Sequence, residues 1–249
     1  MFGTRDFAYA DRSGAHDQKG INIVEAMAVE LLVARLWEFD GYLTTTRWPV
    51  RCPDRGYSDV DVVGSCAGGH VRLAECKVRY AAQAVLVVDA DTAIEFETWM
   101  GTWRNCLDNV PRLVESAPAW LPARRDLSDL QFWFCANIWF ADSTAHATAE
   151  AELTRMLRDK CPWGTKGKTV ARIVSTREVL LEVIKRVRGD VVDDKWGRRY
   201  GDPLLDAVRE LVRYSCPKAL GGGRVGQEIA RESARLLMEA LCVAPENSS

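Results

Sequence analysis

Four ionisable side chains gather on two short apolar segments that flank a glycine-bearing turn centred on Gly68. Alternating apolar residues on both sides of such a turn predict an antiparallel hairpin. Antiparallel pairing about this turn sets Asp61 opposite Glu75. The same register sets Asp59 opposite Lys77, so all four side chains share one face. The other face carries an apolar set suited to packing under a helix: Val60, Val62, Ala74, Cys76 and Val78.

The facing carboxylates of Asp61 and Glu75 indicate what chemistry this hairpin supports. Directly opposed side chains have Cβ atoms about 4.5–5.5 Å apart, and two charges about 5 Å apart cost roughly 3 kcal/mol at an effective dielectric of about 20. Lys77 offsets part of this cost, and a divalent cation relieves the rest. An all-oxygen ligand set favours Mg²⁺, with Mn²⁺ as a substitute.

A cation at this position polarises a phosphoryl oxygen and binds a water molecule. Lys77 then orients that water or helps to deprotonate it, and it steadies the developing negative charge. The hairpin therefore has the equipment for phosphodiester hydrolysis. The alternative is that these residues form only the solvated side of an edge hairpin, which leaves two facing acids unexplained.

The segments around the hairpin predict an α/β domain. Apolar residues recur at helical spacing from Ile21 to Phe39, and a β-branched and aromatic segment at residues 41–50 precedes the hairpin as a further strand. An almost unbroken apolar run at residues 130–140 suits a strand covered on both faces. We therefore expect a central mixed β-sheet flanked by helices. Further helices are predicted at residues 91–114, 143–159, 177–188, 203–214 and 226–242, and a further strand at 169–175.

The strand patterns stop at residue 175, which predicts one domain over residues 1–175 and a helical C-terminal region over residues 176–249. This region packs on the same domain or forms an appendage. The first twenty residues contain no apolar signal region, and no apolar run is long enough to span a membrane, so we expect a cytoplasmic protein. Eight cysteines without a CxxC pair, and only three histidines, argue against a zinc site or a disulfide framework.

The order of these features resembles that in the PD-(D/E)xK restriction-endonuclease-like nuclease superfamily, and the Mrr-like group is the nearest within it. The shared order is a helix with an internal glutamate, a Gly-Tyr strand, the SDVD segment, a glycine turn and the ECK tripeptide. The motif aspartate corresponds to Asp61, and the motif glutamate and lysine correspond to Glu75 and Lys77. Val60 stands where a proline precedes the motif aspartate in the family. The resemblance implies a three-layer restriction-endonuclease-like fold with these residues at its active site.

The resemblance also implies the groups that hold the cation, namely Asp61, Glu75 and the backbone carbonyl of Cys76. It further implies a glutamate on the first helix, and two residues compete for that role. Glu30 stands eleven residues before the glycine that ends the predicted helix, which is the offset expected in Mrr-like chains, whereas Glu25 lies on an apolar stripe. A separation of five residues puts the two on different faces of a helix, so at most one approaches the metal.

The hypothesis is therefore a Mg²⁺-dependent endonuclease that hydrolyses phosphodiester bonds in DNA, in restriction, defence or repair. One alternative is a non-catalytic module with a restriction-like fold that binds nucleic acid or protein. Another is an RNA-cleaving effector, because recognition of the 2′-hydroxyl has no short motif. The expected partner is nucleic acid and not a membrane, and the resemblance implies a homodimer or a component of a larger defence or repair complex.

The formal charge of −2 and the pI of about 6.0 provide no general attraction for nucleic acid, so local groups must hold it. The glycine-containing loop with Lys166 and Lys168 is one candidate. Aromatic side chains are another, because bases stack on indole rings. The tryptophans beside predicted loops are the candidates for stacking: Trp48, Trp163 and Trp196. The tryptophans in patterned segments are predicted to pack in the core: Trp99, Trp103, Trp133 and Trp139.

Overall fold

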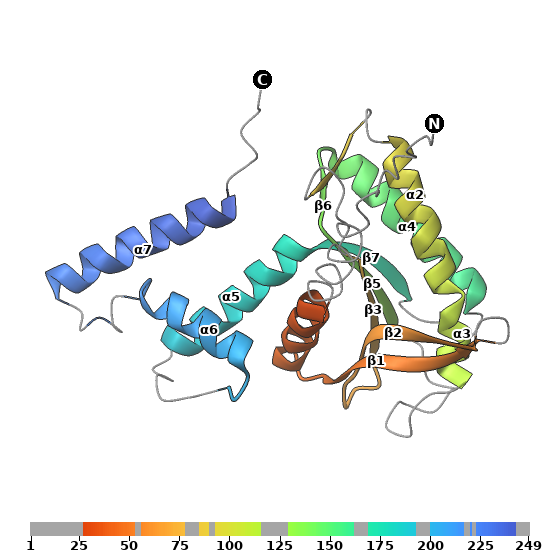
Figure 1. Cartoon of the computed structure of the whole chain (residues 1–249), viewed down its shortest axis with the longest axis horizontal. Helices are drawn as coiled ribbons and strands as arrows, with labels where there is room; N and C mark the ends of the chain where they lie inside the picture. The colour runs from red at the N-terminus through yellow and green to blue at the C-terminus, as the bar shows by residue number, and fades with distance from the viewer. Residues whose placement is uncertain are drawn as a thin grey trace, which may run out of the picture.

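A mixed β-sheet forms the centre of the protein. In the described part of the chain its strand order is β1-β2-β3-β5-β7, in which β1, β2 and β3 are antiparallel and β3, β5 and β7 are parallel (Figure 1). A second, two-stranded parallel sheet joins β4 to β6. The computed structural model describes residues 27–52, 56–77, 85–89, 93–115, 129–161, 169–192, 200–216, 220 and 223–242. The strands are β1 (Leu43–Cys52), β2 (Gly56–Ser65), β3 (Val71–Lys77), β4 (Leu86–Val88), β5 (Leu130–Ala136), β6 (Ile138–Phe140) and β7 (Val170–Ser175).

Helices cover both faces of this sheet, which confirms the predicted α/β architecture with helices flanking a mixed sheet (Figure 1). One layer contains a helix at residues 27–39, called the N-terminal helix below, together with α5 (Thr176–Val192) and α6 (Pro203–Arg213). The other layer contains α2 (Ala93–Leu107), α3 (Asn109–Glu115) and α4 (Ser143–Lys160). The protein therefore has three layers, with helices on each face of the five-stranded sheet.

Two hydrophobic clusters hold these layers together, one on each face of the sheet. The alternation along β5 shows the division, because Phe132 and Phe134 belong to the cluster under α2 and α4, whereas Trp133 and Cys135 belong to the cluster under the N-terminal helix. This second cluster also includes α5 and α6 side chains such as Val183. The helices α5 and α6, which begin the predicted C-terminal region, therefore share a hydrophobic core with the sheet.

Two predicted elements are each divided in the structure. The apolar run at residues 130–140 was predicted as one strand, but Asn137 ends β5 and β6 joins a different sheet. The prediction of burial on both faces is correct for β5 and wrong for β6, where Trp139 is 48% exposed. The helix predicted at 91–114 divides into α2 and α3. Pro111 has no N–H to donate to the Leu107 carbonyl four residues earlier, and its ring clashes with that carbonyl, so a continuous helix is interrupted there.

Side chains of α4 cover the open edge of β7, which is the last strand of the sheet. The Thr154 hydroxyl accepts a hydrogen bond from Ala171 N at 2.9 Å and donates to Ala171 O at 3.3 Å. Glu150 accepts from the backbone N–H of Ile173 at 2.9 Å, and Arg158 donates to the carbonyl of Thr169, the residue before the strand. These side chains occupy backbone groups that an edge strand otherwise offers to another chain.

Replacing Thr154 with valine is expected to lower the free energy of unfolding by about 1–3 kcal/mol. Valine has the shape of threonine but leaves Ala171 N and O without this partner. Chemical denaturation measures the loss, and Thr148→Val is the matched control, because the Thr148 hydroxyl bonds only within the exposed face of the same helix. We expect that control to change stability by no more than about 0.5 kcal/mol. Equal stability of the two variants would show that the edge contact contributes nothing.

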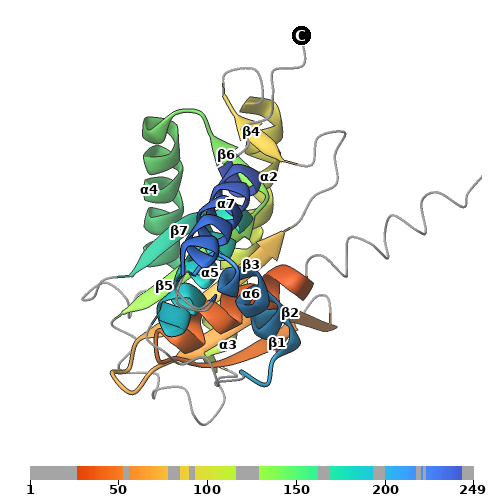
Figure 2. The same ribbon diagram turned by 90° about the vertical axis from the view of Figure 1, so that its left-hand side faces the viewer.

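The helix α7 (Arg224–Cys242) lies beyond α6, away from the sheet (Figures 1 and 2). Its residues Gly226 and Ala230 are buried, whereas Val225 and Leu236 are more than half exposed. Among the described helices, none combines the length and apolar character that a membrane span requires.

Candidate functional site

The β2–β3 hairpin has the register predicted from the sequence. Val62 pairs with Ala74, and the pairs continue to Ser65 with Val71 at the turn. The backbone pairing ends at Val62 and Ala74, and the same register continued by one step would set Asp61 opposite Glu75. At that step the Asp61 carboxylate accepts a hydrogen bond from Cys76 N at 2.6 Å, so a side chain replaces the backbone contact between the strands.

Strand β2 changes its packing at Asp61. Val62 packs with the N-terminal helix as predicted, together with Ala74 and Cys76, but Val60 packs in the cluster under α2. The prediction that Val60 shares the face of Val62 is therefore wrong, and Val78 lies outside the described residues. The register of β1 with β2 is consistent with a local break, because Thr46 pairs with Val62 and Trp48 pairs with Val60, while the intervening Arg47 has a φ of 55°. Such a break interrupts the alternation of side chains between the two faces of β2, which explains why Val60 and Val62 face different layers.

The Asp61 carboxyl is buried among other charges. Its residue is only 8% exposed, and burial is the largest cause that raises the pKa of Asp61 from 3.8 to about 7. The nearby charge of Glu75 raises that pKa further, whereas Lys77 and the hydrogen bond from Cys76 N lower it. A carboxyl in this environment retains its charge at neutral pH only against a considerable free-energy cost. Asp59, by contrast, is exposed on β2 opposite Pro49.

Glu75 and Lys77 form an ion pair beside Asp61. The Lys77 ammonium contacts Glu75 Oε1, and the Glu75 side chain is 9% exposed while that of Lys77 is 41% exposed. Burial by itself lowers the pKa of Lys77, but the charges of Glu75 and Asp61 outweigh burial and raise it above its ordinary value. Lys77 is therefore a stable cation at neutral pH. Its ammonium contacts the Glu75 carboxylate, and part of its side chain is open to solvent.

Glu30 of the N-terminal helix approaches the Asp61 carboxyl from the helical layer that also contains α5 and α6. The Glu30 residue is 4% exposed, and its charge raises the pKa of Asp61. Its carboxylate accepts a hydrogen bond from Arg47 Nε at 3.1 Å. Of the two glutamates that competed for this position, Glu30 is thus placed near Asp61, while Glu25 lies outside the described residues.

Arg47 occupies the left-handed backbone region, in which a side-chain-bearing residue is strained by roughly 1–2 kcal/mol. Arg47→Gly and Arg47→Ala both remove the ion pair with Glu30, but only glycine relieves the backbone. We therefore expect the glycine variant to be more stable than the alanine variant by about 1 kcal/mol in chemical denaturation. Thr45 on the same strand is the control position, where alanine should be the more stable residue. Greater stability of alanine at both positions would show that Arg47 is not strained.

Cys106 of α2 is a neighbour of the carboxylates that sequence reasoning did not identify. Burial is the largest cause that raises the pKa of its thiol, and the charge of Glu75 and a hydrogen bond with Glu75 raise it further. The thiol therefore stays protonated and donates to the carboxylate. A cysteine in an amphipathic helix carries no local signal of such a contact. Cys76, in contrast, directs its thiol toward Cys135 of the neighbouring strand β5, on the face of the sheet that packs under the N-terminal helix, so only its backbone lies at the site.

The donor set fits a magnesium ion better than a zinc ion. Among the described residues, no three His, Cys, Asp or Glu side chains come together as a possible metal cage. Mg²⁺ does not require such a cage, since one or two carboxylates hold it and water and substrate phosphates complete its shell. Asp61 and Glu75 could supply two oxygen ligands, and a cation between them would offset both the burial of Asp61 and the repulsion from Glu75 that raise the pKa of Asp61. The residues present are therefore compatible with Mg²⁺.

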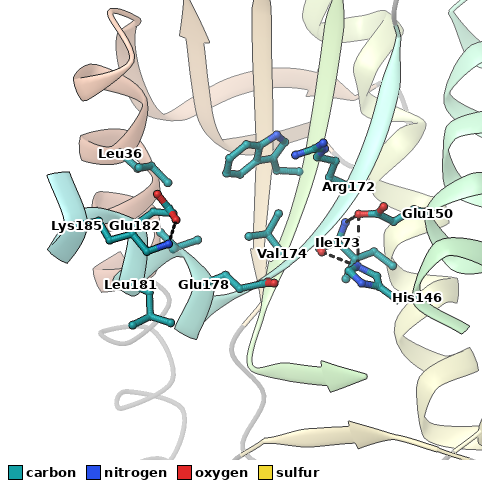
Figure 3. A pocket seen from close by; sticks show the side chains of 12 residues that line it. Leu36, His146, Glu150, Arg172, Ile173, Val174, Glu178, Leu181, Glu182 and Lys185 are labelled. Carbon is teal, nitrogen blue, oxygen red and sulfur yellow. Dashed lines mark hydrogen bonds and ion pairs between the residues drawn. The ribbon is translucent and has the colours of Figure 1, made fainter. Parts of the chain in front are cut away.

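A pocket of about 510 Å³ lies elsewhere, between β7, α4 and α5 (Figure 3). Several of its polar lining groups bind within the pocket wall, since His146 and Glu150 point to the backbone of Ile173 and Lys185 contacts Glu182. Asp61, Glu75 and Lys77 do not line it. The pocket is therefore part of the covered edge of the sheet and not of the carboxylate site. The Lys166 and Lys168 loop, together with Trp163 and Trp196, lies outside the described residues.

Comparison with known proteins identifies no family for this chain. No family model matches the sequence, and no curated protein matches it. A solved structure described as "Protein of Unknown Function AF1548" is similar over 85% of this chain and 97% of its own, with 14% sequence identity and a TM-score of 0.32. A similarity at this level supports no argument about either fold family or function.

Proposed function

We propose that this protein is a Mg²⁺-dependent nuclease with a restriction-endonuclease-like fold, and that DNA is its substrate. The observation that supports this most directly is the pair of buried carboxylates, Asp61 and Glu75, beside the cationic Lys77. Burial and mutual repulsion raise the pKa of Asp61 to about 7, which is costly in a group with only a structural role. A divalent cation removes that cost.

Asp61 and Glu75 would hold the metal ion, together with the backbone carbonyl of Cys76 that the family resemblance implies. When bound, Mg²⁺ supplies Lewis-acid polarisation of a phosphoryl oxygen and lowers the pKa of water. Glu30 lies near enough for its charge to act on Asp61, so it strengthens the attraction for the cation. These roles make the carboxylates responsible for binding and not for proton transfer.

Lys77 acts through its positive charge. Because its pKa is raised, it is not a base at neutral pH, so of the two roles predicted from the sequence we propose the orienting and electrostatic one. Its contact with Glu75 holds the ammonium at the site, and its exposed side faces the solvent from which a substrate arrives. There it steadies the negative charge that develops on the phosphoryl oxygens.

A cleavage assay tests the proposal. Supercoiled plasmid, linear duplex, single-stranded DNA and RNA are incubated with the full chain in Mg²⁺, in Mn²⁺ and in EDTA. We expect cleavage of DNA that requires the metal and that is lost in Asp61→Ala and Lys77→Ala. Activity that survives both substitutions would exclude this site. Absence of activity on every substrate would favour a non-catalytic binding module, and cleavage of RNA alone would favour an effector.

A further inference from the structure

The exposed indole of Trp139 lies at the same edge of the sheet as the carboxylate site. Strands β3, β5 and β7 are parallel, and their register aligns Lys77, Ala136 and Ser175 in one row at their carboxyl ends. Adjacent strands are about 4.8 Å apart, so the row spans about 10 Å. Trp139 follows Ala136 by three residues and Arg177 follows Ser175 by two, which places both beyond the row.

Trp139 presents a half-exposed aromatic surface, and a cation lies over one face of its ring while the rest of the indole is open to solvent. The residue is 48% exposed, and the Arg177 guanidinium carbon lies 5.3 Å from the centre of the indole ring. Its register partner on β4 is Val87, and Val85, two residues before it, is 46% exposed. The intervening Leu86 is buried. The outer face of the small sheet is therefore apolar and accessible, with a positive charge at its border.

We propose that Trp139 and Arg177 form a stacking platform that binds a single-stranded segment of nucleic acid next to the carboxylate site. The inference rests on the proposed nuclease function and adds the strand state of the substrate. An indole accepts any base as a stacking partner, and a guanidinium adds a cation–π contact and attraction for phosphate. Bases inside a duplex already stack on each other, so an exposed indole gains a base only from an unpaired strand.

Binding measurements in EDTA test the platform without cleavage. The full chain is titrated against a fluorescein-labelled single-stranded DNA oligonucleotide and against the same sequence as a duplex, with anisotropy as the readout. We expect Trp139→Ala to weaken single-strand binding about 5- to 100-fold and to leave duplex binding unchanged within about twofold. Arg177→Ala should reduce the slope of log K against log salt by about 0.7.

Matched variants separate stacking from general damage. Tyr214→Ala removes another exposed aromatic residue and Arg155→Ala removes another exposed arginine, so both should bind like the unmodified protein. Trp139→Phe keeps an aromatic ring and should restore most of the affinity. A Trp139→Ala protein that binds as tightly as Tyr214→Ala would overturn the platform, as would failure of the unmodified protein to bind any single strand. Equal losses on single strand and duplex would overturn the assignment of strand state.

Failure of this inference is distinguishable from failure of the proposed nuclease. Metal-dependent cleavage by a protein whose single-strand affinity does not depend on Trp139 would remove only the platform. Single-strand binding that depends on Trp139, in a protein that cleaves no substrate, would support the platform and remove the nuclease.

Discussion

Replacing Lys77 with alanine is expected to lower the rate of Mg²⁺-dependent phosphodiester cleavage by about 10²–10³-fold. This is the loss typical of removing one group that stabilises charge in a transition state. Lys77 is the cation that contacts Glu75 and has a side chain open to solvent, so its loss leaves developing negative charge without a partner at the site. Single-turnover rates at saturating protein measure the effect and separate it from weaker substrate binding.

Lys185→Ala is the matched control for that substitution. Lys185 also pairs with a nearby glutamate, Glu182, but it lies on α5 and its side chain is 67% exposed. We expect this variant to cleave at the unmodified rate. Thermal unfolding of Lys77→Ala must show a folded protein, because the substitution leaves Glu75 without its ion pair. A folded Lys77→Ala protein with the rate of Lys185→Ala would remove Lys77 from the mechanism.

Replacing Asp61 with asparagine is expected to stabilise the metal-free protein at pH 8 by a few kcal/mol, on the order of 1.4 kcal/mol for each unit by which the pKa is raised. Asparagine has nearly the same shape and its amide oxygen can still accept the hydrogen bond from Cys76 N. It removes the buried charge that Glu75 opposes. Urea denaturation in EDTA measures the gain, and lower stability of the variant would show that the Asp61 charge is well satisfied without a cation.

The pH dependence of stability gives the same residue a second test. The pKa of Asp61 is raised from 3.8 in its ordinary state to about 7 in the folded protein, so the folded state binds the proton more tightly. This contribution to stability is fully present below pH 3.8 and is lost as pH rises through about 7. The difference between Asp61→Asn and the unmodified protein should therefore grow over this window. A difference independent of pH would contradict the assigned pKa.

Magnesium should reverse which of the two proteins, the unmodified one or Asp61→Asn, is the more stable. A ligand that binds only the folded state stabilises it in proportion to the logarithm of its concentration above Kd. We expect the melting temperature of the unmodified protein to rise with Mg²⁺ at pH 8 and that of Asp61→Asn to change little. An equal rise in both would place the ion elsewhere.

Local pattern was sufficient to predict the hairpin and its register. A turn of two glycines and the two-residue period of a strand are local properties, so the opposition of Asp61 and Glu75 followed from their distance to the turn. The error at Val60 has the opposite origin. The break in pairing at Arg47 and Asp61 lies between β1 and β2. The residue pattern of β2 alone carries no information about the backbone conformation of β1, so it could not predict this break.

The sequence by itself determined the α/β order of elements and the hairpin that sets Asp61 against Glu75, since periodicity and turn residues act over a few positions. Only the tertiary structure brought Glu30 and Cys106 to that hairpin, because helices distant in the chain pack on opposite faces of the sheet. It also decided the charge of Lys77 and the exposure of Trp139. Both depend on how much solvent and which charges surround a side chain, and these are known only once separate elements have packed together.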